Sequence, residues 1–170
     1  MLVTRRPFRP PVLDIRLLGL TAAVTLASCG SNGPPIDQGP VVATRRFVSN
    51  AAALARLGIP VPRVLRLMRI PAIERDAVHY QPLAGQTLRD AMRAGLPPAR
   101  IAALKAAFTA FIVRLHDQGV YFRSLHLGNV ILTPDGELGL IDFADLRIHP
   151  WGLGRYLRAR NMRRMQGMAD

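Results

Sequence analysis

Cysteine and lysine are scarce in this sequence of 170 residues. Cys29 is the single cysteine, which excludes an internal disulfide and a cysteine-based zinc cluster. Of the 23 lysine and arginine residues only Lys105 is a lysine, a bias that indicates codon composition rather than a chosen chemistry. The sequence also lacks zinc-finger spacing and a basic tract with interleaved aromatics. The formal net charge of +12 therefore predicts a solvated basic surface that attracts polyanions, and no specific nucleic-acid site.

A hydrophobic run long enough to span a bilayer is also missing from the N-terminal part. The apolar stretch at 17–27 is too short for a membrane-spanning helix. It follows an arginine-rich segment and precedes Ser28, Cys29 and Gly30, an order typical of a secretory signal. The tetrapeptide LASC resembles the bacterial lipobox, in which the cysteine is acylated. Residues 1–28 are thus either a signal or lipoprotein-like segment or the remnant of an N-terminal subdomain, and the sequence leaves both open.

The remainder reads as one continuous unit. Hydrophobic residues make up 49% of the chain, enough for the core of one ordinary domain or of part of a larger one. Residues 29–42 contain the Gly- and Pro-rich GSNGPPIDQGP and are expected to form a linker. Residues 43–170 are expected to form a single domain.

Apolar periodicity and turn residues predict the elements of this domain. We expect helices over 43–58, 88–95, 97–119 and 155–170, and strands over 62–70 and 72–81. Thr87 is the expected N-cap of the second helix, and Pro98 lies in the first turn of the third. This order of elements indicates an α+β fold with a largely helical second half.

Residues 121–146, YFRSLHLGNVILTPDGELGLIDFADL, carry the most informative pattern. The turn signal at 134–137 lies between two apolar runs and predicts a β-hairpin. Folding the chain back about Asp135 and Gly136 sets Asn129 opposite Asp142. Amide and carboxylate oxygens are ligands that suit Mg²⁺ with phosphate and water in the rest of its shell. Spacing alone leaves open that both residues merely terminate strands.

This segment resembles the catalytic loop and metal segment of the protein-kinase-like superfamily, HRDLxxxN followed by DFG. FRSL (122–125) occupies the HRDL position, HLGN (126–129) the LHxGN ending, and DFA (142–144) the DFG position. Within the superfamily it looks most like the lipopolysaccharide core (heptose/Kdo) kinases and the related bacterial toluene-tolerance proteins. The resemblance covers roughly 43–165, with an interlobe hinge near 80–87. It implies a protein-kinase-like fold, mainly the helical C-lobe with an incomplete N-lobe.

The resemblance also implies the chemistry of the site. Asn129 and Asp142 would bind the Mg²⁺ that accompanies ATP, and His126 would lie beside the cofactor and order the loop. Ser124 stands at the position of the catalytic Asp, next to Arg123. The implied acceptor is a sugar of the lipopolysaccharide core, on the cytoplasmic side of the inner membrane of a Gram-negative envelope. The basic C-terminal segment suits such an anionic acceptor or the membrane surface.

Several parts of a working kinase are missing. Ser124 is a very poor base, and the loss of one general base costs a factor of ~10²–10⁴. No lysine precedes Lys105, Asn50 falls where the helix Glu of a kinase would be, and the glycines of residues 1–40 do not form a GxGxxG loop. We therefore expect weak or absent phosphotransfer. The alternatives are a non-enzymatic pseudokinase that binds a nucleotide or partner, an exported lipoprotein anchored at Cys29, or a damaged start joined to a kinase-like remainder.

Overall fold

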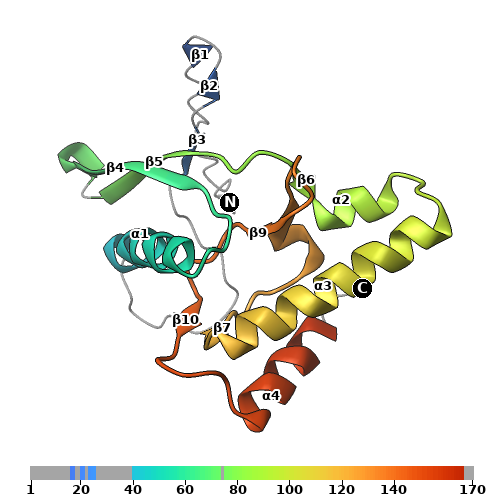
Figure 1. Ribbon diagram of the computed structural model, residues 1–170. Coiled ribbons are helices and arrows are strands. Elements are labelled where there is room, and N and C mark those ends of the chain that lie inside the picture. Colours follow the sequence, from blue (N-terminus) through green and yellow to red (C-terminus); the bar gives the residue numbers. More distant parts are fainter. Residues whose placement is uncertain (1–15, 18–19, 22, 26–39, 74, 167–170) are drawn as a thin grey trace, which may run out of the picture.

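The computed structural model describes residues 16–17, 20–21, 23–25, 40–73 and 75–166 (Figure 1). This part of the chain is a mixed α+β structure with four α-helices and small antiparallel sheets, so the predicted α+β class is confirmed. The helices are α1 (Pro40–Arg56), α2 (Leu88–Arg93), α3 (Pro98–Asp117) and α4 (Arg155–Gln166). The 3₁₀ turns are η1 (Pro71–Ile73) and η2 (Leu127–Asn129). The strands are β1 (Arg16–Leu17), β2 (Leu20–Thr21), β3 (Ala23–Thr25), β4 (Arg63–Ile70), β5 (Arg75–Gln81), β6 (Gln86–Thr87), β7 (Val120–Tyr121), β8 (Val130–Leu132), β9 (Leu138–Leu140) and β10 (Arg147–Ile148).

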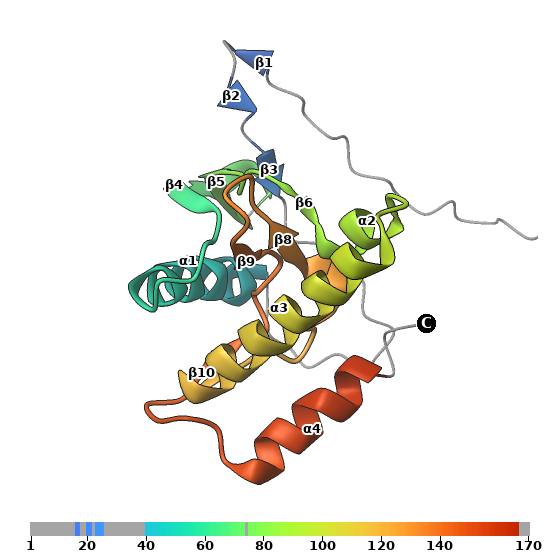
Figure 2. The ribbon, with the colours of Figure 1, turned by 45° about the vertical axis from the view of Figure 1, so that its right-hand side comes forward.

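The first part of the fold is a sheet covered by one helix. Strands β3, β5 and β4 pair antiparallel in that order, and α1 lies against β5 in both views (Figures 1 and 2). α1 buries Ala51 and Leu54, while β5 buries Ala77 and Val78. The helix begins three residues before the predicted 43, so residues 40–42 continue it rather than the linker. Cys29 and residues 26–39 lie outside the described residues.

The second part is helical, with α3 as its central element. Leu104, Phe111, Ile112 and Leu115 form the buried face of α3, as the spacing predicts. Burial of each such side chain is worth about 1.5–3 kcal/mol. The predicted cap of α2 is also present, because Thr87 Oγ1 accepts a hydrogen bond from the backbone N–H of Asp90 (3.1 Å). Figure 2 shows α4 running beside α3. No helix within the described ranges is long and apolar enough to cross a bilayer.

A short hairpin, β8–β9, joins the two parts. Thr133 and Glu137 close its turn: Thr133 N donates to the carbonyl of Glu137 (2.9 Å), and Gly136 N donates to the carbonyl of Thr133 (3.0 Å). The turn thus contains three residues, and Gly136 takes the left-handed conformation (φ 83°) that such a turn needs at its last position.

This turn sets the register of the hairpin. Val130 pairs with Leu140, which places Asn129 opposite Ile141. The backbone N–H of Ile141 donates to the carbonyl of Asn129 (3.0 Å). The prediction that Asn129 lies opposite Asp142 is therefore wrong by one residue, because the turn has three residues instead of the assumed even number. Asp142 nevertheless follows immediately after the paired position.

Gly139 lets the hairpin approach the loop after α1. A Cβ at Gly139 would lie 2.5 Å from both the carbonyl oxygen of Pro60 and the Cδ2 of Leu83. At the next residue, Leu140 N donates to the Pro60 carbonyl (2.9 Å). A continuous core then extends from α1 to α3, and its fully buried members include Leu54, Ile59, Leu88, Phe122, Leu140 and Phe143.

Candidate functional site

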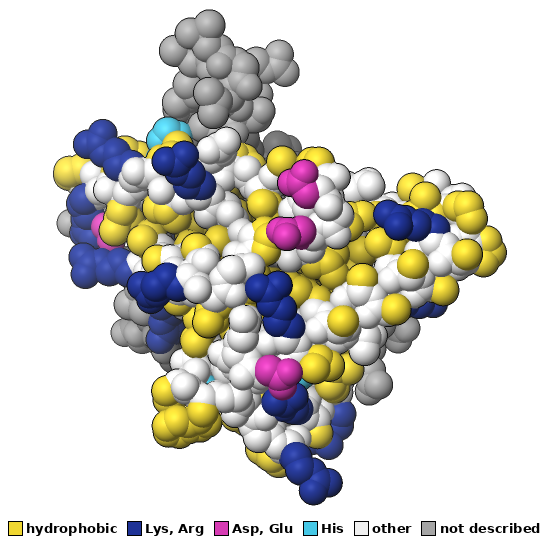
Figure 3. Space-filling model, in the orientation of Figure 1, with side chains coloured by type: hydrophobic (Ala, Val, Ile, Leu, Met, Phe, Trp, Pro, Cys, Tyr) yellow, Lys and Arg dark blue, Asp and Glu magenta, His cyan; other side chains and the backbone are white. Residues whose placement is uncertain are grey.

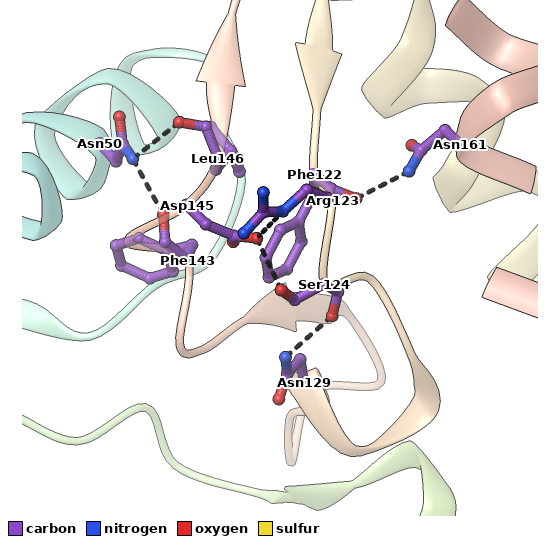
Figure 4. Close-up of polar contacts among 9 residues, drawn as sticks. All are labelled: Asn50, Phe122, Arg123, Ser124, Asn129, Phe143, Asp145, Leu146 and Asn161. Carbon is purple, nitrogen blue, oxygen red and sulfur yellow. Dashed lines mark hydrogen bonds and ion pairs between the residues drawn. The ribbon is translucent and has the colours of Figure 1, made fainter. Parts of the chain in front are cut away.

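Two buried side chains anchor the loop at 122–129, the loop that resembles a kinase catalytic loop. Phe122 and Leu125 are buried (0% and 1% exposed), whereas Arg123 is exposed and Ser124 is half-buried. Just before the loop, β7 pairs antiparallel with β10, with Tyr121 opposite Arg147. This pairing brings the loop alongside the segment that follows Asp142 (Figure 4).

Ser124 and Asn129 are in direct contact, and Asp142 directly follows the residue that pairs with Asn129. Asn129 is buried, and its side-chain Nδ2 donates to the backbone carbonyl of Ser124 (3.0 Å). Its Oδ1 is thus the side-chain atom left to face a cation. Asp142 is exposed and adjacent to the Ile141–Asn129 hydrogen bond. It has a left-handed backbone (φ 52°), which costs an L-residue about 1–2 kcal/mol and is tolerated best by Asp and Asn.

The pKa of the Asp142 carboxyl is raised above its usual value. Burial is the main cause, and repulsion from the nearby Asp145 carboxylate adds to it, while His126 acts in the opposite direction. Although the residue is exposed, its carboxylate is partly shielded from water and repelled by a second carboxylate, and a nearby positive charge would offset both effects. The electrostatics at Asp142 therefore favour a metal ion or another positive charge.

His126 orders the loop, as the sequence indicates. Its Nδ1 accepts a hydrogen bond from the backbone N–H of Gly128 (3.0 Å) at the start of η2. Burial lowers the pKa of His126, the Arg89 guanidinium lowers it further, and Asp142 partly offsets both. The imidazole is therefore held neutral, which its acceptor role at Nδ1 requires. Direct contact of His126 with a cofactor stays a prediction.

Asp145 belongs to the candidate site, although no motif in the sequence predicts it. Its Oδ2 accepts a hydrogen bond from the hydroxyl of Ser124 (2.6 Å) and lies 3.5 Å from Arg123 Nε (Figure 4). Its Oδ1 is buried without a hydrogen-bond partner in the described part of the chain. Continuing the β7–β10 register by two positions sets Asp145 opposite Arg123. That pairing is the signal that would have found it, but strands of two residues are too short to predict.

Asn50 connects α1 to the segment after Asp142. Its Nδ2 donates to the backbone carbonyls of Phe143 (2.9 Å) and Leu146 (3.2 Å). The ring of Phe143 stacks on Phe47 of the same helix, with centroids 4.7 Å apart. The Asn50 amide is thus a structural contact between α1 and the segment after Asp142.

A second amide connects α4 to the loop. Asn161 is buried, and its Nδ2 donates to the Phe122 carbonyl (2.8 Å). Its Oδ1 lies 3.0 Å from Nε2 of His116, which is also buried, in α3. Asn161 thus ties α4 to the start of the loop at Phe122 and to His116 of α3.

The residues present fit part of a magnesium shell rather than a complete protein cage. Within the described residues no group of three or more His, Cys, Asp and Glu side chains could hold a metal ion. Asn129 and Asp142 offer two hard oxygen ligands, which is the number that Mg²⁺ takes from a protein when phosphate and water supply the rest.

The surroundings add two observations. A hollow of about 420 Å³ lies beside the β8–β9 turn, and Ser124, Asn129 and Asp142 are not among its lining residues, which are Gly85, Gln86, Arg100, Leu132, Thr133, Pro134 and Gly136. On the face of the molecule in Figure 3, lysine and arginine side chains are spread over several elements rather than gathered in one patch. This spread agrees with a generally solvated basic surface.

No protein-family model matches this chain, and no curated protein is significantly similar to it.

Proposed function

We propose that this protein is a kinase-like domain of the lipopolysaccharide-kinase type that binds a magnesium nucleotide at Asn129 and Asp142. One observation supports this proposal: the side chain of Asn129 donates to the Ser124 carbonyl, and the Asn129 carbonyl accepts from Ile141, the residue just before Asp142.

The arrangement of elements also supports the proposal. In this proposal the small sheet with helix α1 corresponds to an incomplete N-lobe. Helices α2, α3 and α4 correspond to a helical C-lobe. The segment between β5 and α2 corresponds to the hinge. Fold-level analogy of this kind does not by itself establish an activity.

Each residue has a defined part in this proposal. Asn129 and Asp142 would hold the ion, which neutralises charge on the phosphates when bound. The acceptor would be an anionic sugar of the lipopolysaccharide core at the inner membrane, attracted by the arginines of α4. Transfer to that acceptor would be weak, since position 124 carries a hydroxyl and the Asp145 carboxylate beside it is already engaged by Ser124.

A pseudokinase is the second candidate, and Asn50 favours it. Its amide is committed to two backbone carbonyls, and the single lysine, Lys105, is exposed on α3. The lysine–glutamate pair of an active kinase is therefore replaced by a structural contact. A protein of this kind would bind nucleotide and act through its shape.

The test is the melting temperature of the full chain with ATP, with Mg²⁺ and with both. Binding at 100 times the Kd adds about 2.7 kcal/mol, which raises the melting temperature by several degrees. We expect this shift only with Mg²⁺ and ATP together, and we expect Asp142→Ala to abolish it. Asp135→Ala, which removes an exposed carboxylate at the hairpin tip, is the matched control. An equal shift in Asp142→Ala would contradict the site.

The exported-lipoprotein alternative has a separate test. The periplasm supplies no ATP, so this alternative excludes the proposed chemistry. The mass of the mature N-terminus distinguishes them, because an intact Met1 is incompatible with acylation at Cys29.

A further inference from the structure

We propose that Ser124 is itself a phosphoryl acceptor and that the Asp145 carboxylate accepts its proton. The proposal rests on the proposed function, because a bound nucleoside triphosphate must supply the phosphoryl group. It assigns a modification site at Ser124 and a catalytic residue, Asp145, beyond those that the resemblance implies.

The first argument is the hydrogen bond between the two residues. The hydroxyl of Ser124 is the donor and Asp145 Oδ2 the acceptor, since an ionised carboxylate can only accept. Their 2.6 Å separation is in the range of a charge-assisted O–H···O⁻ bond. This is the contact in which a carboxylate orients and deprotonates an attacking hydroxyl.

The second argument is that Asp145 is poorly placed to serve any other hydroxyl. Its Oδ1 is buried, out of reach of an external acceptor. Its Oδ2 is engaged by Ser124 and lies 3.5 Å from Arg123 Nε. The hydroxyl that this carboxylate faces is therefore the one on Ser124.

The third argument is that Ser124 and Asp145 lie close to the candidate ion ligands Asn129 and Asp142. Ser124 is half-buried rather than fully enclosed. Its own carbonyl accepts the Asn129 side chain (3.0 Å), and Asp145 is close enough to Asp142 to raise the pKa of the Asp142 carboxyl. Nucleophile, proton acceptor and candidate ion ligands thus lie in one place.

The reaction balances without a further reactant. Ser124 Oγ forms a bond to the γ-phosphorus of the nucleoside triphosphate, the bond from that phosphorus to the bridging oxygen breaks, and the nucleoside diphosphate leaves. The hydroxyl proton goes to Asp145 Oδ2 and then to water. The product phosphate would repel Asp145, and Arg123, whose side chain is 60% exposed, can turn from Asp145 to pair with it.

A purely structural role for the Ser124–Asp145 bond makes a different prediction. If the bond only joined the loop to the segment after Asp142, its removal would lower stability, and Ser124 would carry no phosphate. Detection of phosphate on Ser124 therefore separates the two roles, whereas a loss of stability does not.

The experiment uses the full chain, as purified and after incubation with Mg-ATP, with phosphate located by mass spectrometry of peptides. We expect phosphate on Ser124, none in Ser124→Ala, and retained phosphorylation in Ser124→Thr, which keeps a hydroxyl. Asp145→Asn should slow phosphorylation about 10²-fold while keeping the Mg-ATP thermal shift. Ser49→Ala, at an exposed serine of α1, is the control and should change nothing.

The outcomes separate this proposal from the proposed function. A thermal shift with Mg-ATP but no phosphate on Ser124 overturns the phosphoacceptor and leaves nucleotide binding intact. Phosphate on Ser124 at an unchanged rate in Asp145→Asn overturns the role of Asp145. Absence of both the thermal shift and the phosphate overturns the proposed function as well. If Asp145→Asn melts below the assay temperature, Asp145→Glu, which keeps the carboxylate, replaces it, and a rate that remains normal there supports the proposal.

Discussion

The side-chain amide of Asn50 donates a hydrogen bond to the backbone carbonyl of Phe143 over 2.9 Å, one residue beyond Asp142. The same nitrogen reaches the Leu146 carbonyl, so a helix of the first part fixes the backbone of the candidate metal segment in the second. The position of Asp142 thus depends on a residue of α1 that is not itself a candidate ion ligand.

Removal of this amide should loosen the segment. We expect Asn50→Ala to lower the free energy of unfolding by about 1–2 kcal/mol, since two carbonyls lose their donor. Asn50→Asp should cost more, because a carboxylate cannot donate to a carbonyl. Denaturant titration measures both, with Ser49→Ala as the neighbouring control. An Asn50→Asp variant as stable as the wild type would contradict the role of the amide.

The amide of Asn161 should matter more, because it is buried. Asn161→Ala leaves the Phe122 carbonyl and His116 without their partner, and we expect a loss of about 2–3 kcal/mol in the free energy of unfolding. Arg160→Ala, at the exposed neighbouring position of α4, should change it by less than about 0.5 kcal/mol. Equal effects of the two substitutions would show that the network does not stabilise the fold.

Gly139 tests the close approach of the hairpin to Pro60. Gly139→Ala places a methyl group against a backbone carbonyl that cannot move freely, so we expect a loss of about 1–3 kcal/mol. At Gly154 an added Cβ meets nothing within 4 Å, and Gly154→Ala should be neutral or slightly stabilising. Thermal melts of the two variants provide the comparison, and a tolerated Gly139→Ala would mean that the hairpin and Pro60 are not in contact.

The raised pKa of Asp142 predicts a pH dependence of stability. The fold disfavours the ionised carboxylate, so this residue lowers stability as pH rises from the unfolded-state value of 3.8 through its folded-state pKa. Asp142→Asn should therefore be more stable than the wild type at neutral pH without Mg²⁺, and this gain should vanish below pH 3.8. Urea titrations at several pH values measure it, with Asp135→Asn as the charge-matched control. A gain that does not change with pH would contradict the assignment.

Restoring the kinase-type carboxylate requires two changes. Ser124→Asp alone would bring a second carboxylate against Asp145, and like charges at this distance oppose ionisation of both. We expect transfer from Mg-ATP to an added acceptor in the double variant Ser124→Asp, Asp145→Asn, and little or none in the single variant. Phosphate transfer to lipopolysaccharide core oligosaccharide is the measurement. A single variant that is fully active would mean that Asp145 does not interact with position 124.

The elements with local signals could be predicted from the sequence. The capping side chain of Thr87 and the apolar face of α3 each depend on neighbours a few residues away. The loop residues Ser124 and Asn129 could be located for the same reason, because their motif is contiguous.

The remaining features depend on contacts between distant segments. The register at Asn129 was predicted one residue out because the number of turn residues depends on whether Thr133 pairs with Glu137. The role of Asp145 depends on the two-residue pairing of β7 with β10, and that of Asn50 on the docking of α1. Neither contact leaves a periodic pattern in the sequence.

The two hydrogen bonds of Asn50 also bear on the order of folding, because they join residues 93 and 96 positions apart. The entropy lost on closing a loop grows with its length, so we expect these bonds to form after the β4–β5 hairpin and α3. On this hypothesis the candidate metal segment is among the last regions to reach its native position. In the folded protein, we expect the amides of 143–146 to exchange with solvent hydrogen before those of α3 do.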